Sequence, residues 1–450
     1  MADETNEDSS HAATDDLEED FVTLGAVHDN DDDEDNDEET SSQDGKAYST
    51  GAYDPQRDLP PWMSQHVNHQ QIHHLVALHN EIVGFCKLME PHPEEMKERS
   101  DLVQRFTVLV KKVFKNSQVD VFGSQATGLC LPDSDIDIAI QFNDDPATAE
   151  DEDLKKTEDG KLKISKEQEV KDMKNWDAPS GSPLDRLAEA LRDEWLEDLS
   201  YLEVIPNTRV PLVKFTHGPT NISVDVCFNQ TNGVQAAKLI HQYMDALPPL
   251  RPLTFVLKYF LAARGMNKPY SGGMGSFMLQ MMIVSFLQQR EREFVYNKMP
   301  TNYNLGALLV EFFELYSMDF NYVTTGVSVR FDGYYFPKGA ADRKEDFWQP
   351  GRPFSFAMEN PLEPNMDVGA PSFRVAVIHR AFEIAFKVLL AYVTEPVQPT
   401  VSILASVLPP TDEMKKRATL TRLKPLSAPR GGGGGHKSST HSPPRKRQRR

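Results

Sequence analysis

Two aspartates on a strand-like run constrain this chain more than any other feature of its sequence. Asp135 and Asp137 alternate with the apolar residues Ile136, Ile138 and Ile140. Alternate residues on a strand point to the same side, so both carboxylates project from one face, roughly 6.5 to 7 Å apart, while the isoleucines face a core. Two neighbouring carboxylates repel each other, and burying them is costly unless a cation compensates their charge. A divalent metal ion is the natural compensation.

A glycine-serine pair precedes this run. Gly123 and Ser124 are followed, after ten intervening residues, by Asp135. Glycine lets main-chain N–H groups approach phosphate oxygens, and the serine hydroxyl adds another donor. Two alternating aspartates alone are more often a surface hairpin with solvated side chains. The upstream Gly-Ser and the alternating isoleucines favour a phosphate cradle beside a metal site.

Asp225 supplies a third carboxylate. Phosphoryl-transfer enzymes with two metal ions clamp both the attacking and the leaving oxygen, and they need further acidic ligands to do so. Asp225 lies in an apolar strand-like run and shares a strand face with Ser223 and Cys227. An edge strand can carry one solvated aspartate, but packing does not explain an acid here. We therefore predict Asp135, Asp137 and Asp225 as catalytic residues and metal ligands.

This combination of motifs resembles the DNA polymerase β-like nucleotidyltransferase superfamily. Three later runs resemble its eukaryotic DNA polymerase sigma group, the poly(A) polymerases of RNA surveillance found in TRAMP-type complexes. These runs are Thr231-Asn232-Gly233, Arg251-Pro252-Leu253 to Val256-Leu257-Lys258, and Tyr270-Ser271-Gly272-Gly273 to Gly275-Ser276-Phe277. The resemblance covers roughly residues 60–390. The ordered combination is specific, whereas any one motif is not.

The resemblance implies a nucleotide site beside the carboxylates. Gly233 would lie against the nucleotide, and Lys258 and Ser276 would contact the triphosphate. Phe277 would stack on the incoming base. Judged without the resemblance, Lys258 is interpreted as a helix lysine with a partly buried stem, and Phe277 as a core residue.

One segment departs from the group. A Pro-Leu-x-Pro segment should lead into an Asn-Asp-Val-Gly-Arg-like run that recognises the nucleotide. Here Met366 stands in place of the asparagine and Ala370 in place of the arginine. Asn365, one position earlier, is the candidate replacement for the asparagine, and the arginine has no evident replacement. The resemblance therefore implies nucleotidyl transfer, whereas this segment does not imply strict selection of ATP.

Charge separates two tails from the rest of the chain. The net charge is −20, yet the first 50 residues hold 19 Asp and Glu against one Lys, and the last 40 hold 12 Lys and Arg against two acids. Highly charged segments with few apolar residues do not fold alone. We expect a disordered acidic tail over 1–60, a nucleotidyltransferase domain over 61–232 with a charged insertion at 143–180, a helical PAP-associated domain over 233–395, and a disordered basic, Gly-rich tail over 396–450.

Periodicity predicts an α+β fold of two lobes, a small mixed sheet lobe and a mainly helical PAP-associated lobe. Helices are expected over 71–90, 93–116, 183–196, 305–316 and 373–392, and in three runs between 234 and 289 that break at Pro248-Pro249 and Gly272-Gly273. Strands are expected over 119–122, 136–140, 202–205, 209–215 and 221–228, with an aromatic strand-like stretch at 327–336. The first helix is expected to pack on the helical lobe.

Residues and resemblance together predict a template-independent RNA nucleotidyltransferase that adds adenylates from ATP to RNA 3′ ends with two Mg2+ or Mn2+ ions, in nuclear RNA surveillance and processing. The alternatives are a terminal uridylyltransferase and a catalytically silent scaffold that binds RNA and helicase partners. The resemblance implies a zinc-knuckle RNA-binding subunit and an RNA helicase as partners. No membrane partner is expected, because the most apolar run, 274–287, is too short to span a bilayer.

The basic C-terminus has two functional interpretations. Arg445-Lys446-Arg447 with Arg449-Arg450 is a candidate nuclear-import signal or an electrostatic arm for RNA phosphates. The alternative is a merely solvating tail. The expected location is the nucleus, with the nucleolus as a further option.

Overall fold

The computed structural model describes residues 58–63, 72–142, 181–292, 303–339, 347–394 and 402–423. The charged insertion at 143–180, most of the acidic tail and the terminal basic cluster lie outside these residues. Among the helices described, none combines the length and apolar character needed to cross a bilayer.

A five-stranded sheet forms the first lobe, and it confirms the predicted mixed sheet. Its strand order is β1-β2-β5-β4-β3, and β2 and β5 pair in parallel while the other pairs are antiparallel. The strands are β1 (Ser117–Phe122), β2 (Ile136–Phe142), β3 (Leu199–Ile205), β4 (Leu212–His217) and β5 (Ile222–Phe228). The parallel pair at the centre places the ends of two distant segments next to each other.

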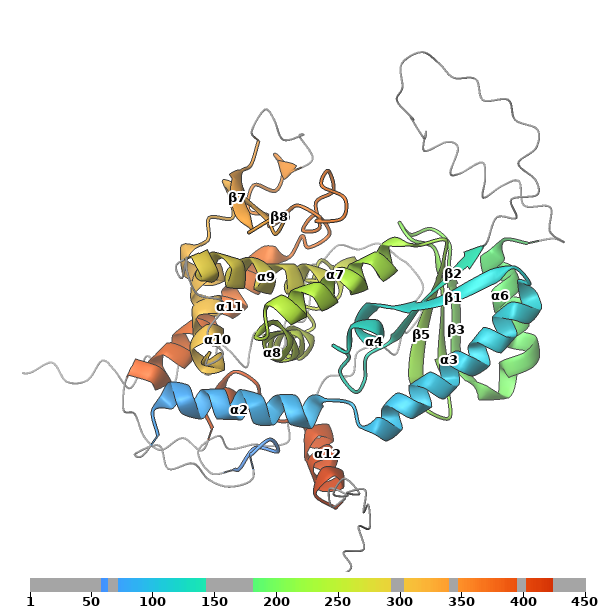
Figure 1. The fold of residues 1–450 in the computed structure, drawn as a ribbon, viewed down its shortest axis with the longest axis horizontal. Coiled ribbons are helices and arrows are strands. Elements are labelled where there is room, and N and C mark those ends of the chain that lie inside the picture. The colour runs from blue at the N-terminus through green and yellow to red at the C-terminus, as the bar shows by residue number, and fades with distance from the viewer. Residues whose placement is uncertain are drawn as a thin grey trace, which may run out of the picture.

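Two helices supply the core of the sheet lobe. Helix α3 (Pro93–Val113) and helix α6 (Pro183–Trp195) bury apolar residues at helical spacing against the strands. Figure 1 shows α6 on the side of the sheet away from the helices of the other lobe. The start of α6 is set locally, because Ser182 and Asp185 form a reciprocal capping box.

The second lobe is built from helices around one large apolar core. Helix α2 (His74–Met89) packs on α8 (Leu250–Ala262) and α10 (Leu305–Glu314) of this lobe, which confirms the expected placement of the first helix. The lobe also contains α7 (Asn232–Ala246), α9 (Ser276–Arg292) and α11 (Val375–Thr394). The breaks before α8 and α9 fall at the Pro-Pro and Gly-Gly pairs.

The aromatic stretch predicted as a single strand is a hairpin. Strand β6 (Thr325–Ser328) and strand β7 (Tyr334–Pro337) pair antiparallel, and β8 (Ala357–Met358) joins β6 in parallel. Phe331 and Gly333 have φ of 57° and 71°, and such left-handed residues reverse the chain rather than extend it. The prediction of one strand over 327–336 was therefore wrong.

The expected boundary at residue 396 was also wrong, because the fold continues beyond it. Ile403, Leu404 and Val407 are at most 1% exposed and belong to the helical core. Helix α12 (Asp412–Leu423) follows. The buried Glu81 of α2 accepts hydrogen bonds from the N–H groups of Ile403 (2.9 Å) and Leu404 (3.3 Å) and from the Ser402 hydroxyl. This part of the supposed tail is a structural element of the helical lobe.

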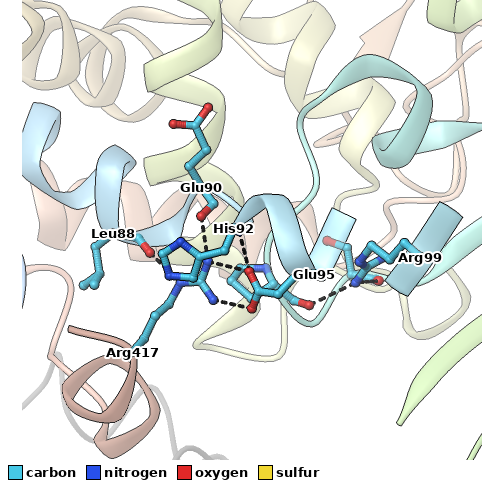
Figure 2. A network of polar contacts seen from close by, with 8 residues as sticks. Leu88, Glu90, His92, Glu95, Arg99 and Arg417 are labelled. Carbon is cyan, nitrogen blue, oxygen red and sulfur yellow. Dashed lines mark hydrogen bonds and ion pairs between the residues drawn. The ribbon is translucent and has the colours of Figure 1, made fainter. Parts of the chain in front are cut away.

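Arg417 of α12 braces the junction between the lobes, where α2 ends and α3 begins (Figure 2). Its Nε donates to the carbonyl of Leu88 (2.6 Å), and Nη2 donates to the carbonyl of Glu90 (2.6 Å). The same guanidinium forms a two-pronged pair with Glu95 at 2.5 and 2.9 Å. Burial alone would raise the pKa of Glu95, but the bonds from Arg417 and the His92 N–H lower it. One side chain thus holds the end of one helix and the start of the next.

We expect Arg417→Ala to lower the free energy of unfolding by about 2 kcal/mol, because it leaves two carbonyls and a partly buried carboxylate without their donor. Lys416→Ala, an exposed change on the same helix, is the control and should have little effect. Since the folded pKa of Glu95 is lowered, the part of the wild-type advantage that comes from Glu95 should be complete at neutral pH and be lost as the pH falls below 4.5, while the part from the two carbonyls should remain. Thermal unfolding of both variants at pH 7 and pH 3.5 measures this. Equal melting temperatures for the two variants at pH 7 would contradict the brace.

Candidate active site

The structure brings the three predicted carboxylates to one edge of the sheet. Asp137 on β2 and Asp225 on β5 are register partners across the parallel pair. Asp135 lies one residue before β2. Ile136, Ile138 and Ile140 are at most 1% exposed, so the alternation between acidic and apolar faces is confirmed as predicted. Two segments almost 90 residues apart therefore contribute to a single acidic site.

The carboxylates oppose one another electrostatically. The pKa of Asp137 is raised from 3.8 to about 7, mainly by burial and then by the charges of Asp225 and Asp135, against the opposing effects of Lys258 and Lys214. A group with this pKa is ready to exchange a proton for a metal ion near neutral pH.

Lys214 is a site residue that the sequence analysis missed. Its ammonium lies 3.5 Å from Oδ2 of Asp135 and 3.5 Å from Oδ1 of Asp225. It comes from β4, where it is the register partner of Asp225. Pairing the predicted strand 209–215 with the strand that carries Asp225 would have revealed it. A cation therefore already lies between two of the three acids.

Whether these residues suit a divalent metal depends on their donor atoms and on the charge of the site. Within the described parts of the chain, no group of three or more His, Cys, Asp or Glu side chains is arranged to hold a metal ion. The donor set nevertheless fits one, because carboxylate oxygens are the ligands that Mg2+ and Mn2+ prefer. The raised pKa of Asp137 and the position of Lys214 show that the site demands positive charge. Asp135, Asp137 and Asp225 are thus suitable ligands once Lys214 gives way.

Gly123 is required by the carboxylate site itself. It begins the short helix α4 (Gly123–Thr127) with φ of +64°. A Cβ at this position would lie 1.9 Å from Oδ2 of Asp137. The glycine therefore lets the chain pass directly over the acid. Ser124 follows it and is partly buried, and its contact with a phosphate stays a prediction.

Four of the residues predicted to bind nucleotide, Gly233, Lys258, Ser276 and Phe277, come from three helices. Gly233 lies near the start of α7, where a Cβ would lie 2.4 Å from the ring of Phe122. Close packing on a strand residue thus accounts for this glycine, and its contact with the nucleotide stays a prediction. Ser276 is exposed at the start of α9, while Phe277 is partly buried against the helical core.

Lys258 reaches across from α8 to the turn that leads into β2. Its ammonium donates to the carbonyl of Leu129 (3.3 Å) and to the hydroxyl of Ser134 (3.2 Å). Burial lowers its pKa, and nearby acidic groups oppose that effect. Lys258 is therefore not a surface lysine, and it links the helical lobe to the acidic edge of the sheet.

The segment that departs from the expected recognition motif lies against the sheet lobe. Asn365 is exposed. The sulfur of Met366 lies 3.4 Å from Nη2 of Arg209, which stands in the connection between β3 and β4. Glu363 accepts a hydrogen bond from Asn232 at the start of α7. The contact between Arg209 and Met366 joins the two lobes at a second place, separate from the carboxylate turn.

Comparison with known proteins agrees with this architecture. Residues 78–245 match the family of the central palm domain of mitochondrial-like poly(A) RNA polymerase, and residues 304–366 match the Cid1 family poly A polymerase. The chain is similar to the polymerase core of TRAMP, an RNA surveillance complex, with a TM-score of 0.61, 29% identity, and coverage of 78% of this chain and 99% of that one. Cid1 poly(U) polymerase bound to a UTP analogue has the same fold at 17% identity and a TM-score of 0.54, with coverage of 74% and 97%.

Curated relatives define the family. Poly(A) RNA polymerase protein 1 of Saccharomyces cerevisiae is 32% identical over 73% of this chain and 46% of its own length. The inactive non-canonical poly(A) RNA polymerase protein Trf4-2 of Drosophila melanogaster is 31% identical over 69% and 68%. The chain spans about half the length, or less, of the fungal relatives it matches.

The palm sheet with three acids at its edge and the PAP-associated helical lobe are the architecture that these family matches describe. The chain belongs to the family of non-canonical poly(A) RNA polymerases.

Proposed function

We propose that this chain is a template-independent RNA nucleotidyltransferase that adds adenylates from ATP to RNA 3′ ends. The observation that carries the proposal is the register of Asp137 and Asp225 on adjacent parallel strands, with Asp135 immediately before the first. All three acids are present, although an inactive relative exists. A scaffold without activity would have no need to keep three mutually repelling carboxylates together.

Each residue has a role in this chemistry. Asp135 and Asp137 would hold two Mg2+ or Mn2+ ions, and Asp225 would hold one of them. When bound, the ions would lower the pKa of the RNA 3′ hydroxyl and stabilise the pyrophosphate leaving group. Lys258 and Ser276 would contact the triphosphate, Lys258 through its positive charge, and Phe277 would offer a stacking face to the base.

The cellular setting is also part of the proposal. Similarity to the polymerase core of TRAMP, an RNA surveillance complex, supports a role in RNA surveillance. The nuclear setting, and a zinc-knuckle RNA-binding subunit and an RNA helicase as partners, follow from the resemblance of the sequence motifs. The basic cluster 445–450 supports nuclear import or contact with RNA phosphates.

Terminal uridylyl transfer is the second candidate. The observation that favours it is the recognition segment, where Met366 and Ala370 offer no side-chain hydrogen-bond donor. A site that lacks a donor for the base edge discriminates less between bases. The likeness to Cid1 poly(U) polymerase shows a shared fold and gives no support for a preference for UTP.

We expect the purified protein to extend an RNA oligonucleotide with each NTP at different rates, with the highest kcat/KM for ATP by a modest margin. Met366→Asn combined with Ala370→Arg should raise the ratio of ATP to other NTPs about 10-fold, because it restores two donors. Side-by-side assays with the four NTPs, with and without a chelator, measure both effects. Preference for UTP would establish the second candidate. Strict ATP selection together with reduced activity of the double variant would assign base reading to another segment.

A further inference from the structure

The turn that delivers Asp135 is closed on itself. The N–H of Ser134 donates to the carbonyl of Leu131 (3.0 Å), and the N–H of Leu131 donates to the hydroxyl of Ser134 (2.8 Å). Asp135 follows directly. The direction of its carboxylate therefore depends on how this turn is held.

Arg99 of α3 holds the turn from the sheet lobe. Its Nη2 donates to two carbonyls, those of Pro132 (2.9 Å) and Ser134 (2.7 Å). The residue is 2% exposed. Its second terminal nitrogen, Nη1, is buried and makes no hydrogen bond within the described residues. A buried guanidinium is costly unless its N–H donors make hydrogen bonds. The two bonds from Nη2 therefore offset a large part of the cost of burying the charge of Arg99.

The base from which Arg99 acts is itself fixed. Glu95, four residues earlier on α3, accepts hydrogen bonds from Arg417 and from the N–H of His92. Figure 2 shows Arg417, from α12, reaching Glu95 at the start of α3, with Arg99 further along α3. A helix anchored at its first turn gives the guanidinium a defined position, which is what a precise contact to a turn requires.

We propose that Arg99 is a positioning residue for nucleotidyl transfer: by binding the carbonyls of Pro132 and Ser134, it sets the direction in which Asp135 presents its carboxylate to a metal ion. The catalytic part of this inference rests on the proposed function, nucleotidyl transfer. Arg99 acts through the backbone, and it touches neither substrate nor metal. Lys258 of the helical lobe donates to the hydroxyl of Ser134. The turn is therefore held from both lobes, by Arg99 through the turn's backbone carbonyls and by Lys258 through a side chain.

The test compares Arg99→Met and Arg99→Lys with a control, Arg105→Met. Arg105 lies on the same helix and pairs with Asp198 at 2.6 Å, away from the turn. For each full-length variant we would measure the melting temperature, the Kd for Mn2+ from the electron paramagnetic resonance signal of the free ion, and kcat and KM for ATP. Partners that orient metal ligands typically contribute 10- to 100-fold to affinity or activity.

We expect Arg99→Met to weaken Mn2+ binding about 10-fold and to lower kcat about 10- to 100-fold, with KM for ATP changed less than about 3-fold. Arg99→Lys should recover part of both losses, because an ammonium can reach a carbonyl without the planar fork. Arg105→Met should lower the melting temperature at most, with Kd and kcat unchanged.

Wild-type Mn2+ affinity and kcat in a folded Arg99→Met protein would overturn the proposal. If that variant does not fold, a folded Arg99→Lys protein with wild-type values for both would do the same. Failure of the proposed function is distinguished by the wild type: it would bind Mn2+ and add no nucleotide, while the difference in Kd between wild type and Arg99 variants would persist.

Discussion

Asp135→Asn combined with Asp137→Asn should reduce nucleotide addition at least about 1,000-fold while the protein stays folded. The amides keep the shape of the carboxylates but remove the charge that attracts divalent ions. Both side chains stand at the edge of the sheet, and the core-facing isoleucine between them, Ile136, is unchanged. The loss should therefore fall on chemistry rather than on packing.

The same substitution should stabilise the metal-free protein. Because the folded pKa of Asp137 is raised from 3.8 to about 7, its ionised form destabilises the fold. This penalty is absent below pH 3.8, grows between pH 4 and 7, and is complete above that. In a chelating buffer at pH 8 the variant should melt a few degrees higher than wild type, roughly what one or two kcal/mol produces. The difference should vanish near pH 4.

Primer extension with Mg2+ or Mn2+ and thermal unfolding with a chelator measure the two effects. Asp133→Asn is the matched control, since Asp133 is exposed in the same turn and should tolerate the change. Tailing by the double variant within 10-fold of wild type would end the three-carboxylate interpretation. A lower melting temperature at pH 8 would show that the acids do not repel each other as inferred.

Gly123→Ala should reduce activity at least about 100-fold. A methyl group there would meet Oδ2 of Asp137 at 1.9 Å, so the carboxylate must move by more than an ångström, and a displacement of that size can cost 100-fold in rate. The change also costs about 1 to 2 kcal/mol for a left-handed residue with a Cβ.

Gly128 separates these two effects. It has φ of +67°, close to that of Gly123, but a Cβ there would have no atom within 4 Å. Gly128→Ala should therefore lose similar stability and keep most of its activity. The comparison needs kcat and melting temperature for both variants. Equal activities would show that Gly123 serves only the backbone and not the acid beside it.

Local pattern predicted most of the fold because each signal was self-contained. The alternation around Asp135 and Asp137 revealed β2, and the Pro-Pro and Gly-Gly pairs located the breaks before α8 and α9. The third acid, Asp225, was found because its neighbours were apolar. Its pairing with Asp137 could not be predicted, because sequence periodicity does not tell which residues face each other across two parallel strands.

The misses depend on contacts between residues distant in the sequence. Ile403 and Leu404 form only a short apolar run, and their fold depends on Glu81, more than 300 residues earlier. Lys214 is an ordinary strand lysine until β4 pairs with β5. Nothing in the sequence distinguishes Arg99 and Arg417 from the other arginines. Only the folded chain shows that both donate hydrogen bonds to backbone carbonyls.

The passage of the chain from one lobe to the other and back has a consequence for synthesis on the ribosome. Helix α2 emerges before the sheet lobe, yet its partners α8 and α10 begin at Leu250 and Leu305, and the segment that caps Glu81 begins at Ser402. Leu78, Ile82 and Phe85 on the apolar face of α2 are fully buried in the folded protein. This face stays exposed until α8, α10 and the segment from Ser402 have been synthesised. The sheet lobe can close first, since its core draws only on α3, α6 and the five strands. The nascent chain therefore carries an exposed apolar helix ahead of a finished domain, which is the kind of intermediate that chaperones protect.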